Sequence, residues 1–226
     1  MSSDSKASKS DQEVFWAGSF GNEYIARNED TPESLAANLH FFSRSLQRAG
    51  TIASCIEFGA NIGLNLRAMQ VLFPGLALRG VEINRSASDR LAALIGSDNV
   101  AQTSVFDYEV GETFDLAIVK GVLIHLDPAR LPEAYEKIVR ASRRWILVAE
   151  YYSPNPVSVP YRGHSEKLFK RDFAGELLDL YPTLSLVDYG FAYRRDPAFP
   201  QDDLTWFLLE KTHDARQRTD EARVLR

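Results

Sequence analysis

The stretch that decides the fold is Ser54-Cys55-Ile56-Glu57-Phe58-Gly59-Ala60-Asn61-Ile62-Gly63-Leu64-Asn65. Residues 52–58 form an apolar, β-branched run, which predicts a buried strand. The run stops at Gly59, and apolar residues at helical spacing follow over 62–73. A strand, a glycine turn and a helix in this order open the ligand site of many parallel α/β sheets. We expect Gly59 to permit the tight turn and Gly63 to let the helix start lie close to a ligand.

Acidic residues at the ends of two expected strands indicate what this site binds. The loop lacks the Gly-Lys-Ser/Thr end of a phosphate loop and the third glycine of a dinucleotide site. Glu57 would repel a pyrophosphate but suits a cationic ligand. Glu82 follows Gly63 by 19 positions (82 − 63), close to the spacing of about 20 at which a carboxylate binds ribose hydroxyls. Because S-adenosylmethionine (SAM) carries an ammonium, a sulfonium and a ribose, the two acids predict SAM as the cofactor.

Composition restricts the class of protein. The 226 residues suit one α/β domain with a small addition, and 45% hydrophobic with 25% charged residues is ordinary for a globular chain. A net charge of −5 argues against a general nucleic-acid binder. The single cysteine, Cys55, falls in the first expected strand and cannot form a disulfide within the chain, which fits a reducing cytosol. With no signal peptide and no apolar run of spanning length, we expect a cytoplasmic protein without membrane or nucleic-acid partners; the oligomeric state stays open.

The ends of the chain differ in character from its middle. We divide it into a polar, disordered tail (1–11), an aromatic, glycine-hinged segment (12–30), a SAM-binding domain (31–211) and a charged tail (212–226). The segment 12–30 either packs on the core or forms a lid over the ligand. As a lid, it could place Trp16 against the sulfonium by cation–π attraction and Arg27 against the methionine carboxylate.

Strand and helix patterns alternate through the middle of the chain. Expected strands cover 52–58, 77–82, 99–105, 114–120, 145–150, 183–189 and 204–210. This pattern predicts a Rossmann-like, seven-stranded and mostly parallel sheet with helices on both faces and an antiparallel last strand. Ligands then bind beyond the carboxyl ends of the strands. The residues expected at those ends are Glu57, Glu82, Ser104, Lys120 and Glu150.

Residues 151–171 interrupt the alternation as one long loop. Loops of this length in a compact domain are usually functional or disordered, and its tyrosines, prolines and charged residues favour an acceptor-binding role. The four histidines show no metal-type spacing, so we expect no metal.

Long blocks of the sequence resemble a known family. They cover 15–24, 57–66, 120–126, 149–157, 160–164, 169–176 and 200–211. The chain resembles the class I SAM-dependent methyltransferases over roughly 35–211. From Phe15 onward it is similar to the pseudaminic-acid-biosynthesis-associated methylases. That group also resembles azetidine-2-carboxylate synthases, which cyclise SAM itself.

The resemblance implies roles for individual residues around SAM. Gly59, Asn61 and Gly63 would approach the methionine part, with Glu57 near its ammonium. Glu82 would hold the ribose, while Ile83, Val105 and Phe106 would line the adenine pocket. Lys120, Gly121 and Val122 would lie beside the methionine end. Many methyltransferases have an acid where Ser104 stands, so here Ser104 or Asp107 would hold the adenine amine.

Two chemistries remain open for this site. In methyl transfer, an acceptor oxygen or nitrogen attacks the methyl group, with His125, Glu150 or His164 as candidate base. In cyclisation, the amine of SAM attacks its own γ-carbon and methylthioadenosine leaves. Aromatic residues such as Tyr152 could then hold the sulfonium. Arg162, His164, Lys170 and Arg171 would suit an anionic acceptor such as a sugar acid. We favour methyl transfer to a small polar molecule, with SAM cyclisation as the alternative.

Overall fold

The computed structural model describes residues 10–25, 30–161 and 164–212. Its helices are α1 (Asp11–Ala17), α2 (Ser19–Ile25), α3 (Pro32–Ser45), α4 (Leu64–Leu72), α5 (Arg85–Ile95), α6 (Leu131–Ala141) and α7 (Phe173–Leu180), with 3-10 turns η1 (Ser97–Asn99), η2 (Leu123–His125) and η3 (Pro128–Arg130). Its strands are β1 (Ser54–Phe58), β2 (Ala77–Glu82), β3 (Val100–Gln102), β4 (Phe114–Lys120), β5 (Ser142–Glu150), β6 (Val157–Tyr161), β7 (His164–Lys170), β8 (Leu184–Ala192) and β9 (Leu204–Lys211).

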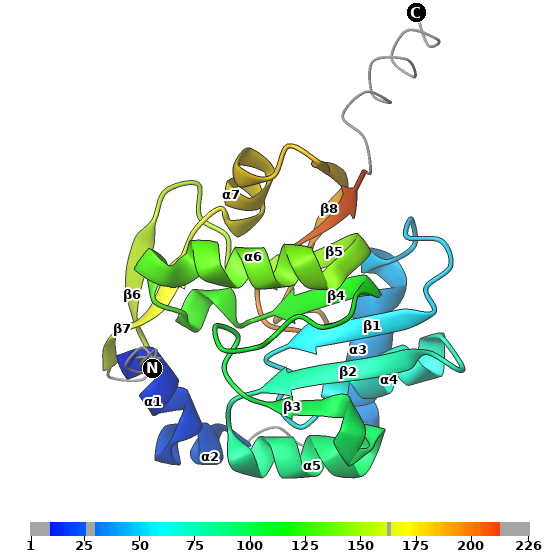
Figure 1. Ribbon diagram of the computed structural model, residues 1–226, viewed down its shortest axis with the longest axis horizontal. Helices are drawn as coiled ribbons and strands as arrows, with labels where there is room; N and C mark the ends of the chain where they lie inside the picture. Colours follow the sequence, from blue (N-terminus) through cyan, green and yellow to red (C-terminus); the bar gives the residue numbers. More distant parts are fainter. Residues whose placement is uncertain (1–9, 26–29, 162–163, 213–226) are drawn as a thin grey trace, which may run out of the picture.

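Seven of these strands form one sheet in the order β3-β2-β1-β4-β5-β9-β8 (Figure 1). The strands from β3 to β5 are parallel, and β9 runs antiparallel to both β5 and β8. The predicted sheet, with seven strands and an antiparallel last strand, is therefore confirmed.

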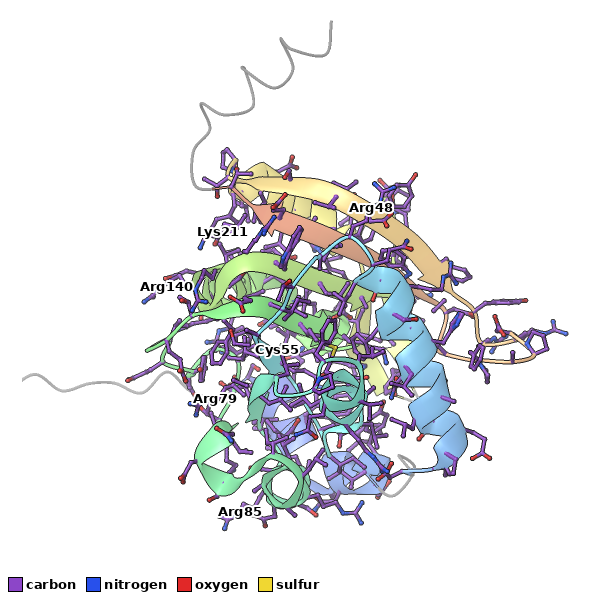
Figure 2. The ribbon with its side chains drawn as sticks, turned by 90° about the vertical axis from the view of Figure 1, so that its right-hand side faces the viewer. Arg48, Cys55, Arg79, Arg85, Arg140 and Lys211 are labelled. Atoms are coloured by element: carbon purple, nitrogen blue, oxygen red, sulfur yellow. The ribbon has the colours of Figure 1, made fainter. Side chains whose placement is uncertain are left out.

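Helices cover both faces of this sheet. Alternate residues along β1 point to opposite faces, so Cys55 joins the cluster under α3, α4 and α5 while Ile56 joins the cluster under α6 and α7. Figure 2 places Cys55 inside the molecule, whereas Arg48, Arg85 and Arg140 lie toward its periphery. Burial raises the pKa of the Cys55 thiol well above its usual range, which fits a core residue rather than a nucleophile.

The carboxyl ends of the parallel strands meet at one edge of the sheet. Helices α1 and α2 lie beside this edge, together with the β6–β7 hairpin (Figure 1). Asn84 caps α5 directly after β2, since its Oδ1 accepts a hydrogen bond from the amide of Ala87 at 3.1 Å. This cap fixes the start of α5 directly after β2, at the edge of the sheet.

Two sequence expectations were wrong in detail. Residues 151–171 are not one long loop, because β6 and β7 pair as an antiparallel hairpin between Val157 and Lys170. The strand expected over 99–105 covers only Val100–Gln102, because the chain leaves the sheet before Ser104, which lines the cavity. In the described residues, no helix is both long enough and apolar enough to span a membrane.

Candidate active site

A cavity of about 730 Å³ opens at the carboxyl edge of the sheet. Its wall comes from α1, α2 and α3, from the loops after β1, β2, β3 and β4, and from the connection between β8 and β9. The volume lies within the usual range for small-ligand sites. Most of the residues that the sequence assigned to SAM reach this wall: Trp16, Gly59, Asn61, Glu82, Ile83, Ser104, Val105, Phe106, Lys120 and Val122.

Glu57 lies just beneath the wall and reaches it through a chain of polar groups. Its Oε1 accepts a hydrogen bond from Asn65 Nδ2 at 2.6 Å, and Lys120 Nζ donates to Asn65 Oδ1 at 3.2 Å. Burial raises the pKa of Glu57 to about 8 and lowers the pKa of Lys120. The other oxygen, Oε2, is buried without a hydrogen-bond partner among the described residues. A cation bound at this end of the cavity would lower the pKa of Glu57 and favour its carboxylate form.

Glu82 fixes the backbone of the glycine loop. Its Oε2 accepts from the amide of Asn61 at 2.8 Å and its Oε1 accepts from the amide of Asn84 at 2.7 Å. Asn61 has φ of 51°, a left-handed conformation that this bond helps to hold. Burial raises the pKa of Glu82, while the amide donors oppose the rise. Each carboxylate oxygen has a further lone pair, so ribose hydroxyls can still bind there.

The two loop glycines serve different purposes. Gly59 has φ of +72°, and a Cβ there would lie 2.4 Å from Cγ2 of Val122, so only glycine lets the two loops meet. Gly63 has φ of +88° and packs against Leu91 and Leu94 of α5. Gly63 is not part of the cavity wall, so its close contact is with α5 and not with a ligand in the cavity.

The loop after β3 forms the expected adenine side of the cavity. The Ser104 hydroxyl is buried and accepts a hydrogen bond from the amide of Asp107 at 3.1 Å, which leaves its own O–H available as a donor. The guanidinium of Arg130 lies 3.8 Å from the ring centroid of Phe106 and so braces that ring. Asp107, the other candidate for the adenine amine, does not line the cavity.

Helices α1 and α2 lie over the cavity and are fastened to the domain at two points. Asn84 Nδ2 donates to the carbonyl of Trp16 at 3.2 Å and to Oδ1 of Asn22 at 3.0 Å. Glu13, buried on α1, accepts from Arg130 at 3.0 Å. The buried indole Nε1 of Trp16 has no hydrogen-bond partner among the described residues, so it offers a donor to a ligand. Arg27, the other predicted lid residue, lies outside the described residues.

His125 is the candidate base that reaches the cavity. Its Nδ1 lies 2.7 Å from the carbonyl oxygen of Lys167, which can only accept, so Nδ1 carries the proton and Nε2 is unprotonated. Burial lowers the pKa of His125 to about 4. Its ring lies between Trp16, at 4.5 Å, and Tyr161, at 5.1 Å between centroids. His125 is therefore neutral at physiological pH, and its unprotonated nitrogen can accept a hydrogen bond.

The other candidate catalytic residues lie elsewhere. Glu150 is buried and not part of the wall; its carboxylate accepts from the amides of Val122 at 2.9 Å and Leu123 at 3.0 Å, which anchors the turn after β4. Burial raises the pKa of Glu150 to about 7. Tyr152 is 43% exposed, and the structure does not bring it to the cavity. The side chain of His164 lies outside the described residues.

Several cavity residues were missed from the sequence. Asn65 follows Glu57 and Asn84 follows Glu82 within a few positions. This closeness in sequence is the signal that could have identified them. Asp202, from the segment before β9, also lines the wall. Because β9 is antiparallel, its first residues start at the same edge where the parallel strands end. In the described part of the chain, no group of three potential metal ligands gathers.

Comparisons with known proteins agree with the fold. No family model and no curated protein matches the chain. Among solved structures, it is similar to the 1,6-didemethyltoxoflavin-N1-methyltransferase of Burkholderia thailandensis, whose structure contains its substrate and S-adenosylhomocysteine. The TM-score is 0.65 at 15% identity, over 89% of this chain and 87% of that chain. The sugar N-methyltransferase KedS8 of Streptoalloteichus gives 0.62 at 15% identity, over 94% and 99%. The N-methyltransferase NodS of Bradyrhizobium japonicum gives 0.60 at 16% identity, over 82% and 100%.

At these identities the likeness concerns the fold alone. The strand order, the antiparallel β9 and the cavity at the carboxyl edge define a Rossmann-like fold of the class I methyltransferase type.

Proposed function

We propose that this chain is a SAM-dependent methyltransferase that acts on a small polar molecule. The observation that carries the proposal is the cavity wall, where Glu82 is held by two backbone amides beside the glycine loop. Glu57 and Asn61 each add a buried oxygen without a described partner. Those acceptors suit the ammonium and the ribose of SAM, and the buried acids would disfavour a phosphate ligand.

In this proposal the residues bind and orient SAM rather than react with it. Glu82 accepts hydrogen bonds from the ribose hydroxyls, and Ile83 and Phe106 pack against the adenine. Glu57 acts on the ammonium together with Asn65. Holding the methyl group in line with an acceptor and excluding water can contribute about 7–11 kcal/mol to such a reaction.

The acceptor side supports a small substrate. His125 lines the cavity, and its unprotonated ring nitrogen can accept a hydrogen bond that orients an acceptor. The neighbouring folds named above are N-methyltransferases of small molecules, which agrees with this reading. A sugar acid or another secondary-metabolism intermediate is the finer expectation from the sequence.

SAM cyclisation is the second candidate, and one observation favours it. The cavity wall includes Tyr24, Tyr151 and Tyr161. Their rings supply the aromatic surface that could hold the sulfonium of SAM with its methionine chain folded. In that reaction the amine of SAM attacks its γ-carbon, a carbon–sulfur bond breaks, and methylthioadenosine and azetidine-2-carboxylate form.

One incubation separates the two candidates. Pure protein is mixed with SAM alone, and the products are measured by mass spectrometry while binding is measured by calorimetry. SAM that binds but stays intact supports a methyltransferase that awaits its acceptor. Enzyme-dependent methylthioadenosine with equal azetidine-2-carboxylate would replace methyl transfer by cyclisation. A protein that binds neither SAM nor S-adenosylhomocysteine would contradict both candidates.

A further inference from the structure

Four polar side chains from four separate elements gather on one part of the cavity wall. They are Tyr24 of α2, Tyr151 after β5, Tyr161 of β6 and Asp202 before β9. The phenol of Tyr151 donates a hydrogen bond to the carboxylate of Asp202. Burial raises the pKa of Tyr151, and the Asp202 carboxylate and the neighbouring tyrosines add to this rise. We call these four residues the tyrosine–aspartate cluster.

The cations near this cluster are already engaged. Lys120 faces Asp202 but donates to Asn65, and it is shared with the carboxylates of Glu57 and Glu150. Arg194 lines the outer wall, but its guanidinium is paired with Asp203 at 3.3 Å and is largely exposed.

Of the positive residues that the sequence offered to an anionic acceptor, Arg162 and the side chain of His164 lie outside the described residues, and Lys170 and Arg171 do not line the cavity. Arg171 is paired with Glu176 at 2.7 Å. Lys170 lies 5.3 Å from the ring centroid of Tyr151 and is not part of the wall. The positively charged side chains of the described wall are thus already engaged and are poorly placed to bind an anion. The same wall offers a carboxylate and aromatic rings to a cation.

We propose that the tyrosine–aspartate cluster is the acceptor subsite and that its ligand is a small amine, protonated at neutral pH, rather than a sugar acid. A carboxylate beside phenol rings and hydroxyls binds an ammonium group by a charge-assisted hydrogen bond and by cation–π attraction. This inference rests on the proposed methyl transfer and names its substrate class.

The reaction balances with the groups present and SAM as co-reactant. The bound ammonium first releases one proton to solvent, because a pKa of about 4 makes His125 too weak a base to hold it. The neutral nitrogen then forms a bond to the methyl carbon as the bond from that carbon to sulfur breaks. The sulfonium becomes the thioether of S-adenosylhomocysteine, and the methylated amine leaves as a cation.

Three probes of one shape test the charge preference directly. Isopropylamine, isopropanol and isobutyrate are titrated at neutral pH into protein saturated with S-adenosylhomocysteine, and binding is followed by NMR chemical shifts. We expect the amine to bind about tenfold more tightly than isobutyrate. In D202N that preference should disappear. In D179N it should persist, because Asp179 of α7 is exposed and does not line the cavity.

Each other outcome counts against the inference. Isobutyrate that binds as tightly as the amine, or wild-type protein that binds none of the probes, would overturn it without any variant. A D202N protein that loses affinity for S-adenosylhomocysteine as strongly as for the amine would assign Asp202 to the cofactor instead. Failure of the proposed function looks different, since the wild-type protein would then not bind S-adenosylhomocysteine at all.

Discussion

Glu82 is the residue on which both the loop conformation and the proposed cofactor site depend. Its two oxygens already receive the amides of Asn61 and Asn84, and ribose hydroxyls would add to the same carboxylate. A buried carboxylate with several donors is a strong acceptor because each bond is charge-assisted. The residue therefore gives a direct test of the cofactor site.

Replacing Glu82 by Gln keeps the volume but replaces one acceptor oxygen with a donor. We expect affinity for SAM to fall by about 1.5–3 kcal/mol, roughly tenfold to a hundredfold, measured by calorimetry. Glu112→Gln is the matched control, because Glu112 is half exposed and pairs with Arg79. Equal affinity in wild type and Glu82→Gln would show that the ribose binds elsewhere.

Glu150 links protonation to stability at the turn after β4. Burial raises its pKa from the usual 4.5 to about 7. Because the folded state holds the proton more tightly, its contribution to stability is full below pH 4.5 and is lost as pH rises through 7. Between these values we expect wild-type stability to fall with pH by about 1–3 kcal/mol through Glu150.

Urea unfolding of wild type and Glu150→Gln at several pH values between 4.5 and 8 measures this contribution. The variant keeps a carbonyl oxygen that can accept from the amides of Val122 and Leu123, so its stability at low pH should be close to that of the wild type and should change less with pH. A difference between the two proteins that is the same at every pH would show that Glu150 does not titrate in this range.

Residue patterns predicted the residues at the cavity wall better than they predicted the positions of the candidate catalytic residues. Glu57 and Glu82 were recognisable because strand ends and a spacing of about 20 residues are local properties. The role of Glu150 was not recognisable from the sequence, because it depends on a turn after β4 whose amides donate to the carboxylate. Tyr152 shares the sequence character of Tyr151, yet neighbours on an extended chain point to opposite sides.

At the scale of elements, α1 and α2 act as one unit over the cavity. Glu13 ties α1 to Arg130, and Asn84 ties the carbonyl of Trp16 to the loop after β2. Both anchoring residues adjoin the expected SAM site, Arg130 through the ring of Phe106. A ligand in that site should therefore strengthen the attachment of the two helices.

Hydrogen exchange tests this coupling. Amides of α1 and α2 should exchange more slowly when SAM is added, and Glu13→Gln should reduce that protection because it removes the charge that holds Arg130. Glu133→Gln serves as control, since Glu133 binds the same guanidinium from α6 at 2.7 Å but does not belong to the lid. If SAM does not change the exchange rates, α1 and α2 pack on the core and do not respond to the ligand.

The hairpin β6–β7 is the element that the sequence concealed. Pro154, Pro156 and Pro160 argued for a loop, because proline cannot donate to a strand ladder. The hairpin tolerates Pro160 at a register irregularity between Val159 and Tyr161. The carbonyl of Lys167 then fixes the His125 tautomer, a contact across 42 positions that no local pattern contains.

At the scale of the whole molecule, strand direction brings the site together. The parallel strands were predictable from alternating patterns and deliver Glu57, Glu82 and Lys120 to one edge. The antiparallel β9 brings Asp202 to that edge from the opposite direction. Asp202 follows Lys120 by 82 positions (202 − 120) and Glu57 by 145 (202 − 57), so their meeting depends on tertiary packing.

Thermal unfolding reports on this assembly as a whole, because a ligand that binds only the folded state stabilises it by mass action. SAM at a hundredfold its dissociation constant should add about 2.7 kcal/mol to the free energy of unfolding. For a chain of this size that corresponds to a rise in Tm of roughly 5–11 °C. Methylthioadenosine lacks the amino-acid part that would meet Glu57 and Lys120, so at the same concentration it should raise Tm much less. Equal shifts for the two compounds would show that the acidic, lysine-bearing end of the cavity does not bind the methionine part of SAM.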